Sequence, residues 1–176
     1  EYVNWREDPE YPFYNDNWKG QFKLTGQIGV KHRVMLNLMY FYADWPWLYP
    51  SPWVMPEAAG TDIKSEPAYF ANWTWMLSKN SYLEVKAGQW GCYEQDMLPT
   101  HGGSLYNAPH FDEVTGVLSG APAWFVWWND NSVQLNTNLS YFAEDFLAGD
   151  HDFKFGVQYK RGLSHASGGY PGNAYY

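Results

Sequence analysis

Apolar and polar residues alternate with a period of two along much of the chain. The apolar positions of the first such segment are Phe22, Leu24, Gly26, Ile28 and Val30. A second segment follows a turn expected at 31–32, with its apolar positions at Val34, Leu36, Leu38, Tyr40 and Tyr42. A period of two places successive side chains on opposite faces of a β-strand. Both segments are therefore predicted to be strands, and the second, about ten residues long, has the length of a tilted strand that crosses a bilayer.

The alternation returns at 69–77 and 83–87, and it is clearest in a hairpin near the end of the chain. In that hairpin one face is predicted to carry Leu135, Leu139, Phe153, Phe155 and Val157, and the other Gln134, Asn136, Asn138 and Lys154. The intervening stretch predicts a short strand at 113–119, a turn at 120–122 and an apolar run without a period at 123–128. The tail from Ser164 is rich in Gly and Ser and shows no pattern. No segment has a helical period of useful length.

The connections between these segments alternate in length. Those at 31–32, 79–81 and 143–150 are short, whereas those at 44–67 and 91–111 are long and contain Pro and Gly. Tight turns at one end and long loops at the other are typical of an up-and-down outer-membrane barrel. We therefore predict an all-β chain of about six to eight antiparallel strands from a large outer-membrane β-barrel, with residues 1–176 as a single barrel segment.

The composition favours the same fold. Aromatic residues make up 20% of the chain and charged residues only 17%, yet the mean hydropathy is −0.52. Soluble domains usually carry about 25% charged residues, whereas a strand between lipid and water needs apolar and small polar residues. The alternative is a soluble, aromatic-rich carbohydrate-binding β-protein, which would remain monodisperse without detergent.

Charge and cysteine content exclude several classes of function. The net charge of −8 argues against nucleic-acid binding, which needs a basic face. The single cysteine, Cys92, excludes an internal disulfide and a zinc site built on cysteines. The sequence contains no run of eighteen apolar residues and therefore predicts no transmembrane helix.

Two stretches carry a resemblance to a known family. The sequences YFAEDF (141–146) and GDHDFKFGVQYKR (149–161) form the hairpin described above, and LTG (24–26) with KHR (31–33) flank the first turn. Together they resemble TonB-dependent outer-membrane receptors, most closely the Oar-like subgroup with a carboxypeptidase-regulatory domain. About fifty residues carry the resemblance, and its specific part is the turn and strand at 141–161.

The resemblance implies a transporter that takes up a bulky nutrient with energy coupling. Such receptors have an N-terminal plug, an energy-coupling box and a barrel of about twenty-two strands. The implied partners are outer-membrane lipid, the remaining barrel strands and, through the N-terminal region, an energy-coupling protein of the inner membrane. Neither plug nor box occurs in the 176 residues, and the chain opens at Glu1 without an apolar leader. We expect a fragment from the middle of a barrel.

Candidate chemistry is sparse. His101 and His110 occur near Cys92, Glu94, Asp96 and Asp112, but without the spacing that makes a metal site specific. The sequence Asn-Asp-Asn at 15–17 lacks the closing Glu of a calcium loop. A carboxylate pair of Glu84 and Glu113 would require the fold to bring them together, and no G-x-S-x-G motif occurs. We expect no catalytic, cofactor or metal site and no enzymatic activity.

Trp45, Trp47 and Trp53, in the first long loop, are the candidate ligand-binding residues. Their rings could stack on a sugar or an apolar ligand. The favoured alternative is an aromatic girdle at the membrane interface.

A separated barrel segment has two unpaired strand edges. The stretches 34–42 and 123–128 are uncharged, free of Pro and rich in β-formers, as segments of cross-β assemblies are. A second hypothesis is therefore that a released fragment assembles through its edges into an extracellular filament or amyloid-like structure with a structural role.

Overall fold

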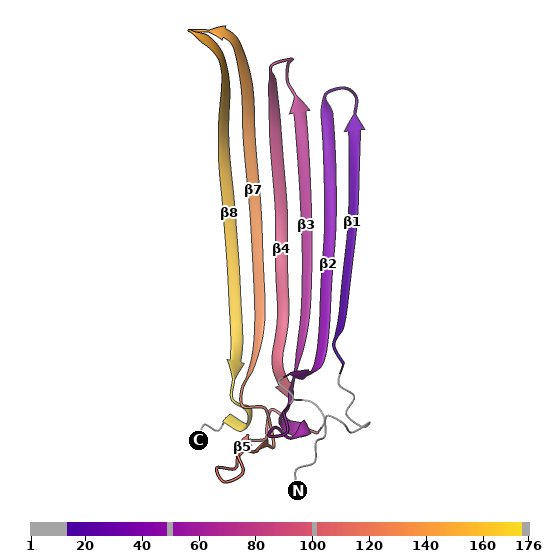
Figure 1. The fold of residues 1–176 in the computed structure, drawn as a ribbon, viewed down its shortest axis with the longest axis vertical. Helices are drawn as coiled ribbons and strands as arrows, with labels where there is room; N and C mark the ends of the chain where they lie inside the picture. Colours follow the sequence, from indigo (N-terminus) through magenta and orange to yellow (C-terminus); the bar gives the residue numbers. More distant parts are fainter. Residues whose placement is uncertain (1–13, 49–50, 100–101, 174–176) are drawn as a thin grey trace.

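The computed structural model describes residues 14–48, 51–99 and 102–173. Six long antiparallel strands form one sheet in the order β1-β2-β3-β4-β7-β8 (Figure 1). Their bounds are β1 (Asp16–Ile28), β2 (His32–Leu48), β3 (Gly60–Met76), β4 (Ser81–Pro99), β7 (Phe125–Phe146) and β8 (Gly149–Gly169). A two-stranded sheet of β5 (His110–Phe111) and β6 (Leu118–Ser119) and the 3-10 turns η2 (Pro56–Ala58) and η3 (Pro171–Asn173) complete the described part. The predicted all-β, antiparallel fold is confirmed.

The strand register extends each face across the whole sheet. One continuous row of cross-strand partners runs Leu24–Leu36–Ala71–Ala87–Leu135–Tyr159. The adjacent row, on the opposite face, runs Lys23–Asn37–Phe70–Gly88–Gln134–Lys160. Period-two alternation thus yields an apolar face and a polar face. The facing predicted for the last hairpin is confirmed, because Leu139 pairs with Phe155 and Ser140 with Lys154.

Several strands are longer than the sequence pattern predicts, so the expected loops at 44–67 and 91–111 are wrong. β2 continues to Leu48 through Pro46, which lies at a register shift between Trp45 and Leu48, where a missing N–H is tolerated. β4 continues to Pro99, and the described loop residues begin only beyond it. Cross-strand pairing, rather than local alternation, holds these polar and proline-containing ends in the sheet.

The second half of the chain requires similar corrections. The strand expected at 113–119 is reduced to β6, and residues 125–128 of the run expected at 123–128 form the beginning of β7. The first part of the tail expected to be patternless from Ser164 belongs to β8, where 164–169 pairs with 125–130; 171–173 form η3, and 174–176 lie outside the described residues. Small Gly and Ser residues give no hydrophobic pattern, but they leave the backbone free to pair.

The hairpin turns differ from those expected at 31–32, 79–81 and 143–150: the first two are shifted to 29–31 and 77–80, and the last is shorter. The first turn occupies 29–31, with Gly29 in the left-handed region at φ 61°. In the last hairpin the strands continue to Phe146 and Gly149, so the connection expected at 143–150 is only two residues long. Its backbone includes Asp145 and Leu147 at φ 50° and 57°, next to a register shift after Ala143. All three hairpin turns lie at the same end of the sheet (Figure 1).

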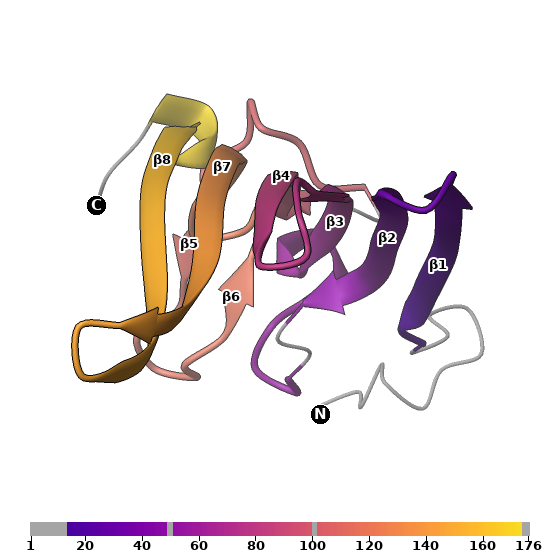
Figure 2. The same cartoon turned by 90° about the horizontal axis from the view of Figure 1, so that it is seen from above.

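Along most of their length the strands form one layer (Figure 2). Every residue of β1 is exposed, and most residues of β8 are as well. The accessible surface of the chain is 12011 Å², compared with about 8,800 Å² for a compact monomer of this mass. We call the single-layered part of the six long strands the exposed part of the sheet. Its two faces are not covered by other elements of the described chain.

Buried residues gather instead at the end opposite the hairpins. There the connections 51–59, 102–124 and 170–173 pack around the ends of β2, β3 and β4, which we call the packed end. Trp47 (2% exposed) packs with Ala59 and Val54. Backbone hydrogen bonds join the connections to one another, from Met55 N to Leu118 O (2.8 Å) and from Gly172 N to Leu105 O (2.7 Å). This end resembles the interior of a soluble protein.

Candidate functional site

The apolar face carries an exposed hydrophobic band in the middle of the sheet. Its aliphatic members are Leu24, Ile28, Val34, Leu36, Leu38, Leu83, Val85, Val133, Leu135, Leu139 and Val157. Most are at least partly open to solvent, from Leu139 at 37% exposed to Val157 at 75%. In β2, the steps from Val34 to Leu38 cover about 14 Å along the strand at 3.4 Å per residue, and the aromatic positions Tyr40 and Tyr42 extend this to about 27 Å. Gln89 and Arg161 interrupt the band in the row of Leu38 and Val133, but an exposed apolar surface of this kind indicates a binding surface.

Aromatic residues gather toward both ends of this apolar band, although Trp73, Trp75 and Tyr69 lie in the same rows as its members Val34, Leu83 and Leu38. Toward the hairpins these are Trp73, Trp75, Tyr141 and Phe153; toward the packed end they are Trp18, Tyr40, Tyr42, Tyr69, Tyr93 and Trp127. His32 lies in the hairpin-side border, where its ring stacks on Trp73 and Trp75 at 5.8 and 5.6 Å. Its Nδ1 accepts a hydrogen bond from Trp73 Nε1 at 3.3 Å. The imidazole is thus integrated into an aromatic cluster.

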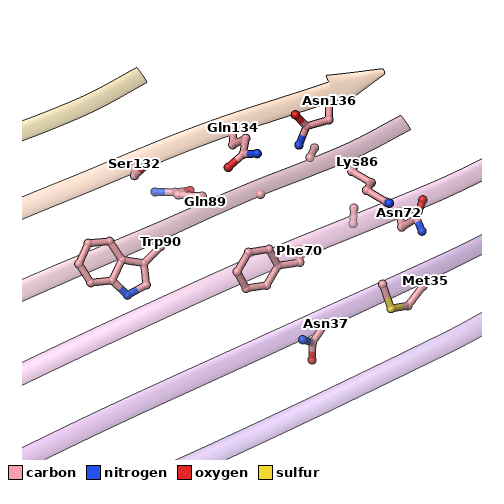
Figure 3. A pocket seen from close by; sticks show the side chains of 13 residues that line it. Met35, Asn37, Phe70, Asn72, Lys86, Gln89, Trp90, Ser132, Gln134 and Asn136 are labelled. Atoms are coloured by element: carbon pink, nitrogen blue, oxygen red, sulfur yellow. The ribbon is translucent and has the colours of Figure 1, made fainter. Parts of the chain in front are cut away.

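A groove lies on the polar face, behind the apolar band (Figure 3). Its volume is about 390 Å³, and residues from β2, β3, β4 and β7 line it. Figure 3 shows Asn37, Phe70, Asn72, Trp90, Gln134 and Asn136 distributed along these neighbouring strands. Aromatic rings and side-chain amides therefore share one concave surface.

A glycine makes room for one of these rings. Phe70 and Gly88 are cross-strand partners. A Cβ at Gly88 would lie 2.7 Å from Phe70 Cδ1 and 3.1 Å from Cε1, so the ring lies across the β4 backbone. Phe70 and Trp90 are 41% and 40% exposed. Two large apolar side chains therefore face solvent at positions where the alternation calls for polar residues.

The charge next to the groove is internally compensated. Lys86 Nζ pairs with Glu84 Oε2 at 2.9 Å. Glu84 Oε1 also accepts a hydrogen bond from Asn72 Nδ2 at 3.4 Å. Lys86 is the charged residue among those that line the groove in the described part of the chain. The groove therefore presents an essentially neutral surface.

A second polar cluster lies on the polar face toward the packed end, beyond the aliphatic members of the apolar band and level with Tyr93 and Trp127. Lys64 Nζ lies 2.8 Å from Glu94 Oε1 and 3.3 Å from Asp62 Oδ2. Asp62 and Asp96 are direct cross-strand partners, and each is more than nine-tenths buried. Like charges directly opposite each other destabilise a sheet.

Burial decides the ionisation of this cluster. It raises the pKa of Asp62 to about 6, with Lys64 opposing the shift and Glu94 and Asp96 adding to it. Burial and the Glu94 charge also raise the pKa of Asp96. Burial lowers the pKa of Lys64, but its contacts with Glu94 and Asp62 outweigh burial and the net shift is upward. The cluster thus holds a charged lysine near two carboxyls, those of Asp62 and Asp96, whose ionisation is opposed by burial.

The three candidate tryptophans are separated by the fold. Trp45 lies on the polar face, where its Nε1 donates to Asn17 Oδ1 at 3.2 Å and Lys64 Nζ lies 5.5 Å from its ring centroid. Trp47 is buried and is inaccessible to a ligand in this arrangement. Trp53 is 48% exposed in the connection before η2. They do not form one platform, and Trp45 does not belong to the aromatic borders of the apolar band.

The other candidates from the sequence do not converge either. His101 lies outside the described residues, and His110 is in β5. Glu84 lies near the hairpin end of β4, whereas Glu113 lies beside β5 at the packed end. Asn17, from the Asn-Asp-Asn sequence, is engaged by Trp45. Within 14–48, 51–99 and 102–173, no three His, Cys, Asp or Glu residues are arranged to hold a metal ion.

Cys92 is buried beside Glu66, with 3.7 Å between its Sγ and Glu66 Oε1.

The groove residues were missed as a site by sequence reasoning. Phe70 and Trp90 interrupt the polar positions of two alternating segments, and this interruption is the signal that could have revealed them. The groove residues on β7 give no such signal, because they reach Phe70 and Trp90 only through the pairing of β4 with β7, which are separated in the sequence by the connection 100–124.

Comparison of the chain with protein-family models, curated proteins and solved structures gives no match. No helix among the described residues has the length and apolar character needed to cross a membrane.

Proposed function

We propose that the chain forms part of the wall of an outer-membrane β-barrel. The apolar band faces lipid, and the polar face, with its groove, faces the lumen. The observation that carries the proposal is the apolar band with aromatic borders on one face of a single-layered sheet. Lipid-facing bands of barrels are about 25 Å tall and have such aromatic borders.

The connections support the same orientation. Short hairpins at one end and long, packed connections at the other correspond to the periplasmic turns and external loops of such barrels. The outer edges of β1 and β8 have no partner strand among the described residues. Further barrel strands would pair with them and close the wall.

The transport role follows from the resemblance to TonB-dependent receptors at 141–161, and we propose energy-coupled uptake of a bulky nutrient across a bacterial outer membrane. Bulky side chains on the polar face, among them Met35, Met39 and Phe41, suit a wide lumen better than a narrow one. Coupling to an inner-membrane protein would proceed through the plug region that the resemblance implies.

Quenching of a fluorophore on neighbouring residues tests the orientation. Leu36 and Asn37 are adjacent in β2 and lie on opposite faces. In a Cys92→Ser background reconstituted into vesicles, a probe on Leu36→Cys should be quenched by brominated lipid, and a probe on Asn37→Cys by iodide. Quenching of both probes by iodide alone would refute the membrane-facing band and favour a soluble carbohydrate-binding protein.

A second candidate is edge-to-edge assembly of the separated chain. It is favoured by β1 and β8, which each offer one unpaired edge within the described residues. Exposed edges template the addition of strands from other copies. Electron microscopy of the isolated chain should then reveal filaments, whereas discrete closed particles alone would exclude this role.

A further inference from the structure

The polar-face groove has the dimensions of a small-ligand site. Its volume of about 390 Å³ falls within the range of about 300–1,000 Å³ that is common for ligand pockets. Four adjacent strands line it, and each row of cross-strand partners contributes one side chain per strand. Side chains on paired strands are held more rigidly than side chains on loops.

The polar groups of the groove are mainly neutral amides. Asn37, Asn72, Gln134 and Asn136 lie on three of its strands. A side-chain amide offers two N–H donors and one carbonyl acceptor, so it can bind a hydroxyl in either role. The charge of Lys86 is balanced by Glu84 at 2.9 Å. An ionic ligand would therefore find no uncompensated counter-charge among the described lining residues.

The apolar groups of the groove are flat rings. The Phe70 ring lies across the backbone of Gly88, and Trp90 lies one row further toward the packed end. Both rings remain about 40% exposed, at 41% and 40%. Covering them with the apolar face of a ligand removes that area from water, which is favourable.

We propose that this groove binds a neutral oligosaccharide. A sugar ring has a face of C–H groups that stacks on an aromatic ring, and hydroxyls around its edge that both donate and accept hydrogen bonds. Asn37 Oδ1 accepts a hydrogen bond from Gln21 Nε2 at 2.9 Å and Asn72 donates to Glu84, but a lipid chain would leave the amides of Gln134 and Asn136 without partners, which costs free energy. The inference rests on the proposed function in one respect: it identifies the transported nutrient class, since the groove would line the lumen.

Binding of defined tetrasaccharides to the purified full chain in detergent tests the proposal. The neutral probes are maltotetraose, cellotetraose, xylotetraose and laminaritetraose; the charged comparators are tetragalacturonate and chitosan tetramer. Isothermal titration should detect at least one neutral probe and neither comparator. We expect Trp90→Ala to weaken that binding at least tenfold and Asn136→Leu, which keeps the volume but removes the amide, to weaken it several-fold.

Trp18→Ala is the matched control, because Trp18 is 64% exposed on the opposite face. It should leave the affinity unchanged. Binding of none of the neutral probes, preference for a charged comparator, or equal affinity of Trp90→Ala and the parent chain would overturn the proposal. If the parent chain binds no probe and Trp90→Ala has a lower melting temperature than the parent chain, the groove is occupied by other parts of the protein and not by a ligand.

The two proposals fail separately. Iodide quenching at Leu36 with intact tetrasaccharide binding would remove the membrane role and keep the sugar site. Lipid quenching at Leu36 without tetrasaccharide binding would keep the barrel wall and remove the sugar.

Discussion

The exposed part of the sheet and the packed end are stabilised in different ways. At the packed end, Trp47, Ala59 and Asp62 are buried by the chain's own connections. In the exposed part, Leu24 in β1 and Phe155 in β8 are more than half exposed, although each of these strands is paired with its neighbour along one edge. Backbone pairing alone therefore fixes the strands, and the side chains of the exposed part depend on the surrounding medium for their burial. Substitutions should consequently act by different rules in the two regions.

The largest expected effect is in the exposed part. In the barrel wall, Leu36→Arg places a charge in lipid and should lower the free energy of unfolding by about 2–4 kcal/mol. Asn37→Arg, on the adjacent residue of the polar face, should change it by less than about 1 kcal/mol. Urea unfolding of both variants in lipid vesicles measures the difference. Equal costs would show that the two faces meet the same medium.

A pH-dependent effect is expected at the packed end. The pKa of Asp62 is about 6 in the folded chain, above its ordinary value of 3.8. The folded state therefore binds the proton more tightly, and stability falls as the pH rises from about 4 to about 6. The cost at neutral pH is at most about 3 kcal/mol, from a shift of about two units.

Asp62→Asn should flatten this part of the stability profile. Melting temperatures measured from pH 4 to pH 7 give the comparison with the parent chain. Asp96, whose pKa burial also raises, should leave a residual fall of the same sign. A profile that is unchanged by Asp62→Asn would mean that the carboxyl is ionised throughout, with Lys64 compensating for its burial.

Close packing at the same end predicts a further difference. A Cβ at Gly60 would lie 2.5 Å from Met97 Cα and 2.9 Å from its carbonyl carbon, so backbone would have to move. Gly60→Ala should cost about 1–3 kcal/mol, as overpacking does. Gly26→Ala, in the exposed part, meets no heavy atom within 4 Å and should be close to neutral. Chemical denaturation of the two variants tests whether the regions differ in packing.

The same contrast explains what could be predicted from the sequence. In the exposed part, residues such as Leu135 and Phe155 follow a period of two because each face of the sheet meets a single environment. The strands, the facing of their side chains and the last hairpin could therefore be predicted from the sequence. Toward the packed end, residues such as Pro46 and Ser167 carry no alternation. Ser167 is held in its strand by its partner Trp127, and Pro46 lies at a register shift between the paired residues Trp45 and Leu48. The groove depends on the same long-range pairing, which aligns Phe70, Gly88 and Gln134 across three strands.

The smallest expected effect is at Asp112, an exposed carboxylate whose pKa shifts in the opposite direction to that of Asp62. Hydrogen bonds from Thr115 and from the Val114 N–H lower its pKa. A lowered pKa contributes stability above the ordinary value of 3.8, and this contribution is lost as the pH falls through the folded value. Asp112→Ala should therefore lower the melting temperature slightly at pH 7, and the difference should shrink toward pH 3. Because the side chain is exposed, this effect should remain well below that of Asp62→Asn. A difference that instead grows as the pH falls would show that Asp112 stabilises the turn mainly in its protonated form.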